Sequence, residues 1–307
     1  MSQSLADAEA AAPFDGRDVA ALVGCSLIWG STWFAITFQL GAVPAAVSVA
    51  YRFALAAAML FAWLAVTRRP VRLTRAQHLA TFAQGALIFG INYPFVYLAE
   101  ERLTSAVVAV LFAGSAFVNL LLFRIAFGAR ASKAAWAAAA LGLAGVGLLS
   151  FDQLSRAHMD GRALAGFAFG VAAVIAAGVG NVAARKAQAL HAELGANTAW
   201  AMAYGAGLLA LFATLAGQRW SFDARPAYVL SLAYLALFGS VTAFLLYFGL
   251  ARRRGYVLAA YISAVTPVIA MLISAVFEHA HWGLEALAGI ACVTVGQVLL
   301  VRAPKGA

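Results

Sequence analysis

Residues 104–127, TSAVVAVLFAGSAFVNLLLFRIAF, decide the fold class of this chain. No charged side chain occurs from Thr104 to Phe123, and about 20 such residues cross the hydrocarbon core of a bilayer as a helix. Nine other runs of this kind precede and follow it. The sequence therefore predicts an all-α membrane protein with ten transmembrane helices, at 18–40, 44–66, 78–99, 104–127, 133–151, 162–184, 195–217, 227–250, 255–277 and 282–302.

The composition of the chain also indicates that a lipid bilayer surrounds the protein. Of its 307 residues, 64% are apolar and 11% are charged, whereas soluble domains average about 45–50% and about 25%. The net charge of +9 comes from small clusters between apolar runs, which indicates loops facing anionic lipid and no nucleic-acid partner. Cys25 and Cys292 fall inside spans and are interpreted as packed residues, and no cofactor or metal site is predicted.

The distribution of Lys and Arg predicts the orientation, because cytoplasmic loops carry an excess of both. Residues 1–17 and 303–307 are predicted to be short cytoplasmic tails, since the first lacks the apolar core of a signal peptide. This arrangement gives five outer basic residues: Arg102, Arg156, Arg162, Arg219 and Arg225. It gives fifteen inner ones: Arg17, Arg68, Arg69, Arg72, Arg75, Arg124, Arg130, Lys133, Arg185, Lys186, Arg252, Arg253, Arg254, Arg302 and Lys305.

The spacing of residues in the two halves of the chain predicts an internal repeat. Phe89-Gly90 precedes Phe95 by the same spacing as Phe238-Gly239 precedes Phe244. Five spans separate the copies, and five is odd, so the second copy is inverted in the membrane. The predicted domains are a first five-helix repeat at 18–151 and a second at 162–302. Inverted repeats are typical of secondary transporters, whose substrate site lies near the midplane between the halves.

Several short motifs occur in a fixed order along almost the whole chain. They are Trp29-Gly30-Ser31-Thr32-Trp33, Arg52, Phe238-Gly239-Ser240 with Phe244 and Tyr247, Thr266-Pro267-Val268, Phe277-Glu278, and Leu287-Ala288-Gly289 with Gly296 and Leu300. On these residues the sequence resembles the EamA-type, ten-helix branch of the drug/metabolite transporter superfamily, and is most similar to its aromatic amino-acid exporters. The resemblance implies export or exchange of small metabolites across the bacterial inner membrane. One departure is that Phe117 and Gly128 stand where the first repeat would have a proline and a closing glutamate.

Arg52 is the one basic residue that belongs to neither the inner nor the outer set, because it lies inside a predicted span, in its outer third. A charge there costs at least about 2.5 kcal/mol unless it is paired or hydrated. One interpretation is that Arg52 binds a substrate carboxylate or acts as a gate. The other is that it extends to the outer headgroups or joins neighbouring helices.

Aromatic and polar side chains near mid-depth predict the rest of the site. Trp29 and Trp33 are four residues apart and share a helix face, where they would offer stacking surface or serve helix packing. Pro267, at the centre of its span, is a candidate gating point, with a stable kink as the alternative. Asn181 is one further polar group. The candidate substrate-binding residues are Trp29, Trp33, Arg52, Asn92, Tyr93, Tyr97, Asn119, Thr242, Tyr261 and Thr266.

No Asp or Glu is predicted at mid-depth, and Glu278 and Glu285 are placed near outer span ends. This pattern favours a facilitator over a proton-coupled exporter. The five histidines form no metal-binding motif and no paired mid-depth aspartates occur, so an enzyme is not predicted. A channel is not predicted either, because the sequence shows neither re-entrant loops nor a ring of like charges. A sugar-phosphate or nucleotide-type carrier of the same superfamily stays open, although it would need more buried cations than Arg52.

The sequence thus predicts an inner-membrane, multi-pass transporter with both termini in the cytoplasm, and it is compatible with a monomer. Its substrate would be a small metabolite, most of all an aromatic or other neutral amino acid. Transport would proceed by alternating access as the two repeats rock against each other.

Overall fold

A computed structural model describes residues 15–128, 132–156, 161–255, 259, 261–278 and 283–302. The described part of the chain is helical and contains no strand. In the first half the helices are α2 (Gly16–Thr37), α3 (Ala45–Val66), α4 (Arg75–Gln84), η1 (Gly85–Asn92), α5 (Tyr93–Glu100), α6 (Ser105–Ala113), α7 (Ser115–Phe127) and α8 (Lys133–Arg156). In the second half they are α9 (Gly161–Ala189), α10 (Leu194–Leu215), α11 (Pro226–Tyr234), η2 (Leu235–Thr242), α12 (Ala243–Arg254), α14 (Tyr261–Phe277) and α15 (Leu284–Arg302).

Seven helical stretches are long and apolar enough to cross a membrane, judged on length and composition within the described residues. They are Gly16–Thr37, Ala45–Val66, Arg75–Glu100, Ser105–Phe127, Gly161–Ala189, Leu194–Leu215 and Pro226–Arg254. Three shorter apolar helices accompany them, at Lys133–Leu148, Val265–Phe277 and Leu287–Gly296. Each predicted span therefore coincides with a helix, and a membrane protein with all-α structure is confirmed.

Two of these stretches change to π-helix in the middle, at η1 and at η2. Pro94 follows η1 and lacks the N–H that an α-helix would direct to Gly90, but no proline follows η2. The feature that both share is a close approach to a neighbouring helix. A Cβ on Gly85 would lie 2.3 Å from the carbonyl oxygen of Ala201, and one on Gly239 would lie 2.8 Å from Cγ2 of Thr32.

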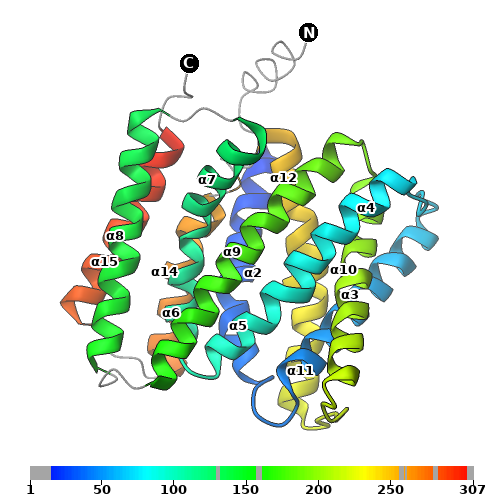
Figure 1. Ribbon diagram of the computed structural model, residues 1–307, viewed down its shortest axis with the longest axis horizontal. Helices are drawn as coiled ribbons and strands as arrows, with labels where there is room; N and C mark the ends of the chain where they lie inside the picture. The colour runs from blue at the N-terminus through cyan, green and yellow to red at the C-terminus, as the bar shows by residue number, and fades with distance from the viewer. Residues whose placement is uncertain are drawn as a thin grey trace.

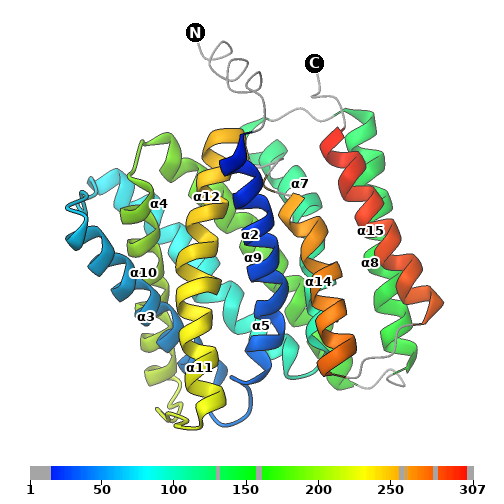
Figure 2. The ribbon, with the colours of Figure 1, turned by 180° about the vertical axis from the view of Figure 1, so that it is seen from behind.

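The helices form a bundle in which helices of the first half pack against helices of the second (Figure 1). Helices α8 and α15 pair at one edge, and α3 and α10 pair toward the other, in both views (Figures 1 and 2). The α8–α15 contact is close because glycines face it: a Cβ on Gly145 would lie 2.5 Å from the carbonyl oxygen of Gly289. Such small-residue contacts are typical of membrane helix pairs.

The first helix of each half packs against the other half. Helix α2 contacts η2, α12 and α14, while α9 contacts α4, η1, α5 and α7. Helices α2 and α9 thus lie in the centre of the bundle, with the start of α2 and the end of α15 at the same end of the molecule (Figure 2). The central position of these two helices places the residues of the Trp29–Trp33 motif in the interior.

Candidate substrate cavity

A cavity lies in the centre of the bundle, between helices of both halves. Its empty space, counting the part open to solvent, is about 910 Å³. None of the lining side chains that the structure describes is charged. They are Trp29, Thr32, Trp33, Ile36, Ile88, Asn92, Tyr93, Val96, Ala109, Phe112, Ala113, Ser115, Asn119, Ala177, Asn181, Phe244, Tyr247, Ser263 and Thr266.

Helix α2 supplies one wall through a single helical face. Trp29, Thr32, Trp33 and Ile36 are spaced three, four and seven residues from the first, which places them along one stripe of an α-helix. The indole Nε1 of Trp29 donates to the carbonyl oxygen of Gly239 in η2 at 3.3 Å. The Trp33 ring lies 5.0 Å from that of Phe112. The predicted shared face of the two tryptophans therefore borders the cavity.

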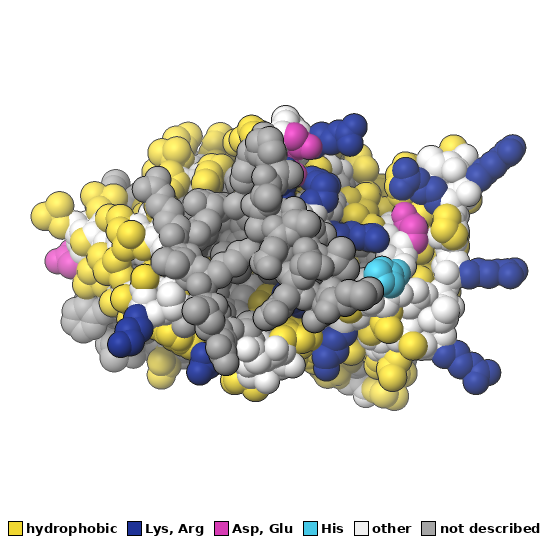
Figure 3. All heavy atoms as spheres, turned by 90° about the horizontal axis from the view of Figure 1, so that it is seen from above, with side chains coloured by type: hydrophobic (Ala, Val, Ile, Leu, Met, Phe, Trp, Pro, Cys, Tyr) yellow, Lys and Arg dark blue, Asp and Glu magenta, His cyan; other side chains and the backbone are white. Residues whose placement is uncertain are grey.

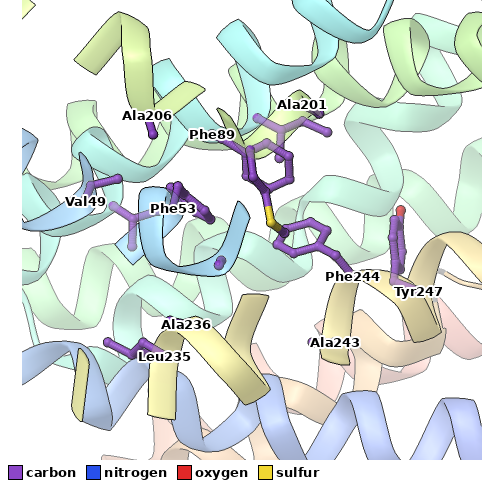
Figure 4. Close-up of a cluster of buried hydrophobic side chains, with 14 of the residues drawn as sticks. Val49, Phe53, Phe89, Ala201, Ala206, Leu235, Ala236, Ala243, Phe244 and Tyr247 are labelled. Atoms are coloured by element: carbon purple, nitrogen blue, oxygen red, sulfur yellow. The ribbon is translucent and has the colours of Figure 1, made fainter. Parts of the chain in front are cut away.

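An array of aromatic rings from several helices includes part of the cavity wall. Phe53, Phe89 and Phe244, from α3, η1 and α12, point toward one another (Figure 4), and of these three Phe244 lines the cavity. Ring centres of Phe89 lie 4.8 Å from Phe53 and 4.9 Å from Phe244. Trp29 continues this array, 5.3 Å from Phe244 and 5.2 Å from Tyr247. These distances are those of favourable aromatic pairs, so the lining rings of Trp29, Phe244 and Tyr247 are held by packing against one another.

Amide and hydroxyl groups interrupt this surface. Asn92 is the last residue of η1, and its Nδ2 donates to the carbonyl oxygen of Ala173 in α9 at 2.6 Å. Asn181 Nδ2 donates to Asn119 Oδ1 at 3.3 Å, which joins α9 to α7. The Thr266 hydroxyl donates to the Ile262 carbonyl oxygen of its own helix at 2.7 Å, and its oxygen can still accept. The cavity thus offers a few polar groups fixed by the bundle itself.

Arg52 is buried, with 1% of its surface exposed, but it does not line the cavity. Its Nε donates to the Ser240 hydroxyl at 3.0 Å. Its guanidinium carbon lies 4.6 Å from the ring centre of Tyr93, which does line the cavity. The side chain therefore joins α3 to η2 inside the protein and does not extend to the outer headgroups.

The other predicted site residues are divided between the wall and its surroundings. Tyr93 borders the cavity together with the two tryptophans, Asn92, Asn119 and Thr266. Tyr97 is fully buried next to that wall, and Thr242 lies away from it, donating to the Leu237 carbonyl oxygen at 3.0 Å. Tyr261 begins α14, but its side chain lies outside the described residues. Pro267 lies inside α14.

Several lining residues were not among the predicted site residues. Thr32 and Ile36 lie on the tryptophan face of α2, so the helical period could have identified them. Phe112, Ser115 and Ser263 gave no signal, because uncharged residues in an apolar span look alike whichever way they face. Phe244 and Tyr247 entered the sequence analysis only through the repeat and the family motifs.

The structure adds a buried acidic residue that the sequence analysis did not single out. Glu100 is the last residue of α5 and only 6% exposed. Glu278 accepts a hydrogen bond of 2.6 Å from the Ser105 hydroxyl. Both carboxyl groups lie toward the end of the bundle opposite the start of α2, so the prediction that no Asp or Glu lies at mid-depth is not contradicted. Among the described residues, no group of three His, Cys, Asp or Glu side chains could hold a metal ion.

Comparisons with known proteins define the class of this molecule. The EamA-like transporter family matches residues 18–151 and, a second time, residues 164–302. Among curated proteins, the chain is 28% identical over 260 residues to the "Uncharacterized inner membrane transporter YedA" of Escherichia coli strain K12, covering 82% of this chain and 80% of that one. The same protein from Escherichia coli O157:H7 matches equally. A solved structure described only as "Crystal structure of protein" superposes with a TM-score of 0.70 at 20% identity, covering 92% and 95% of the two chains, and shows the shared fold.

The all-helical bundle, its central cavity and these matches together define a membrane transporter. The chain belongs to the EamA-like transporter family, within the drug/metabolite transporter superfamily. The resemblance seen in the sequence motifs is thereby confirmed.

Proposed function

We propose that this transporter moves small neutral amphipathic metabolites, above all aromatic and other neutral amino acids, by alternating access. The observation that carries this proposal is the chemistry of the cavity wall. It combines the rings of Trp29, Trp33 and Tyr93 with the amides of Asn92 and Asn119, and none of its side chains is charged. A sugar phosphate would require cations in the wall, so the structure favours the amino-acid proposal over that alternative.

We further propose ten membrane crossings arranged as two inverted five-helix repeats, 18–151 and 162–302. Two observations support this arrangement. The π-helices η1 and η2 stand at equivalent places of the two halves, and the family matches the chain twice, over almost the same two ranges. Five crossings per repeat would invert the second relative to the first.

The proposed location is the bacterial inner membrane, with both termini in the cytoplasm and export as the direction. The name of the E. coli relative supports the membrane, and the excess of Lys and Arg in the proposed inner loops supports the orientation. The end of the molecule that carries the start of α2 shows Lys and Arg side chains spread over its surface (Figure 3). A monomer would suffice, because the cavity lies within one chain.

The test is uptake of labelled phenylalanine, tryptophan, threonine and methionine into liposomes that contain the purified protein. Saturable uptake is expected, and Trp29→Ala should weaken it about tenfold, since it removes a stacking surface worth about 1–1.5 kcal/mol. Trp136→Ala is the matched control, because Trp136 lies on the surface of α8, away from the cavity. Uptake equal to that of empty liposomes for all four amino acids would refute the substrate class.

A further inference from the structure

Several buried polar atoms without a hydrogen-bond partner belong to side chains that line the cavity or lie beyond one end of it. Such atoms are rare in folded proteins, because each costs about 1–3 kcal/mol. Two, on Gln84 and Gln218, lie elsewhere. The others within the described residues are Trp33 Nε1, Arg52 Nη1, Tyr97 Oη, Ser274 Oγ and both carboxylate oxygens of Glu100.

The helix faces that line the cavity continue into this region. On α5, Glu100 lies four residues beyond Val96, which lines the cavity, and so on the same face. On α6, Ser105 lies four residues before Ala109, another lining residue. Ser105 donates to Glu278 at the end of α14. Three helices thus converge one turn beyond the cavity on a set of polar groups.

This polar set contains a basic and an acidic side chain, Arg52 and Glu100, that do not bind each other. Both act electrostatically on the Tyr97 hydroxyl, and Glu278 and Arg52 act on Glu100. No salt bridge joins Arg52 to Glu100, although both side chains are described and more than nine-tenths buried. A buried guanidinium and a buried carboxyl group that do not bind each other, but have free polar atoms, are suited to a ligand that carries one cationic and one anionic group.

We propose that Arg52 and Glu100 form a head-group site for a zwitterion. The Arg52 guanidinium would bind the α-carboxylate of an amino acid, and the Glu100 carboxylate would bind its α-ammonium group. The substrate side chain would lie in the aromatic cavity next to Tyr93. This inference rests on the proposed function and names the chemistry by which the same cavity selects amino acids.

The physical reason for selectivity is the burial of both partners. A guanidinium matches the planar geometry of a carboxylate, and an ionised carboxylate, which only accepts hydrogen bonds, can accept from an ammonium group, which only donates them. A ligand lacking either group leaves one buried charge without compensation, which is costly. Sites of this kind reject incomplete analogues by several orders of magnitude in favourable cases, and we expect at least about tenfold here.

The experiment measures competition for binding to the full-length protein in lipid nanodiscs, with radiolabelled phenylalanine as the probe. The competitors are phenylalanine, 3-phenylpropionate (which lacks the ammonium group) and phenethylamine (which lacks the carboxylate). The wild type should bind both analogues at least tenfold more weakly than phenylalanine. Glu100→Gln should abolish the preference for phenylalanine over 3-phenylpropionate, measured with labelled 3-phenylpropionate as the probe. Arg52→Gln should abolish the preference for phenylalanine over phenethylamine, measured with labelled phenethylamine as the probe.

Glu101→Gln is the matched control, because Glu101 is adjacent in sequence but pairs with Arg102 at 3.1 Å; its selectivity should equal that of the wild type. Glu100→Asp should keep the order of preference with weaker affinity. Equal binding of all three ligands by the wild type overturns the head-group site. A second contradicting result is an equal loss of affinity for all three ligands in Glu100→Gln while Glu100→Asp behaves like the wild type. Failure of the wild type to bind phenylalanine at all would instead refute the proposed function.

Discussion

Asp18, at the start of α2, is a fully buried carboxylate that two arginines from the other half of the chain bind. Arg253 Nε lies 3.2 Å from one of its oxygens, and Arg254 Nη2 lies 2.6 Å from the other. Asp15 accepts from the backbone N–H of Asp18, so the cap of α2 holds the carboxylate in place. One residue therefore joins the start of α2 to the end of α12.

Asp18→Asn should destabilise the protein by about 1.5–3 kcal/mol, the usual contribution of hydrogen bonds to charged groups, and lower the melting temperature in detergent. The matched change is Asp223→Asn, whose ion pair with Arg225 at 2.6 Å lies within one loop. A hydrogen bond from Arg225 lowers the pKa of the Asp223 carboxyl, so that pair is intact at pH 7 and is lost only as the pH falls through this lowered pKa. An unchanged melting temperature in Asp18→Asn would contradict the assigned role.

The sequence predicted those site residues whose signal is local. Trp29 and Trp33 share a face because they are four residues apart, and Asn92 must be satisfied inside the protein because lipid offers no partner. Glu100 could not be predicted, because a charge at the end of an apolar run looks like a loop residue. Its burial depends on α14 and α6, and only the tertiary structure brings these helices to it.

At the scale of helices, each of the two π-helices contains a glycine that lies in close contact with a neighbouring helix. Gly85 and Gly205 permit the contact between η1 and α10: a Cβ on Gly205 would lie 2.4 Å from Cβ of Phe89 and 2.9 Å from the Gly85 carbonyl oxygen. Because Phe89 and Asn92 both belong to η1, this contact sets the position of the cavity wall. The hydrophobic pattern predicted the helices themselves to within a few residues. It could not predict the π-helices, since an apolar run gives no register.

Gly85→Ala should therefore destabilise the protein by about 1–3 kcal/mol, the range for overpacked cores, because its Cβ would meet the backbone of Ala201. Gly207→Ala on α10 is the matched control. Nothing lies within 4 Å of a Cβ there, so the better helix propensity of alanine should stabilise by up to about 1 kcal/mol. Thermal unfolding in detergent measures both, and equal shifts for the two variants would exclude close packing as the reason for Gly85.

At the scale of the whole molecule, hydrogen bonds join helices of different halves into two crossed pairs. In the first crossed pair, α2 is bound to the 226–254 stretch: the Ser31 and Tyr234 hydroxyls are 2.7 Å apart, and Gln39 Nε2 donates to the Tyr228 carbonyl oxygen at 2.9 Å. Asp18 and Trp29 add bonds toward its other end.

In the second crossed pair, α9 is bound to the 75–100 stretch in the same way. Asn92 donates to Ala173 at its centre. Arg162 Nη2 donates to the Glu101 carbonyl oxygen at one end at 2.8 Å, and Gln77 Nε2 donates to that of Leu190 at the other at 2.9 Å. Each pair is bonded along its length, whereas the cavity lies between the pairs. The sequence predicted rocking of one repeat against the other, but these bonds favour movement of one crossed pair against the other.

Spin-label distances distinguish the two movements. The labels are placed at exposed positions in a Cys25→Ala/Cys292→Ala background. Leu27 and Leu237 belong to one crossed pair but to different proposed repeats. Leu27 and Ile91 belong to one proposed repeat but to different crossed pairs. When substrate is added, the Leu27–Leu237 distance should stay constant and the Leu27–Ile91 distance should change. Labels at Val171 and Ile91, within the second crossed pair, should also keep their distance. The opposite result, with Leu27–Ile91 constant and Leu27–Leu237 changing, would show that the repeats move as rigid bodies and that the bonds across the crossed pairs break in every transport cycle.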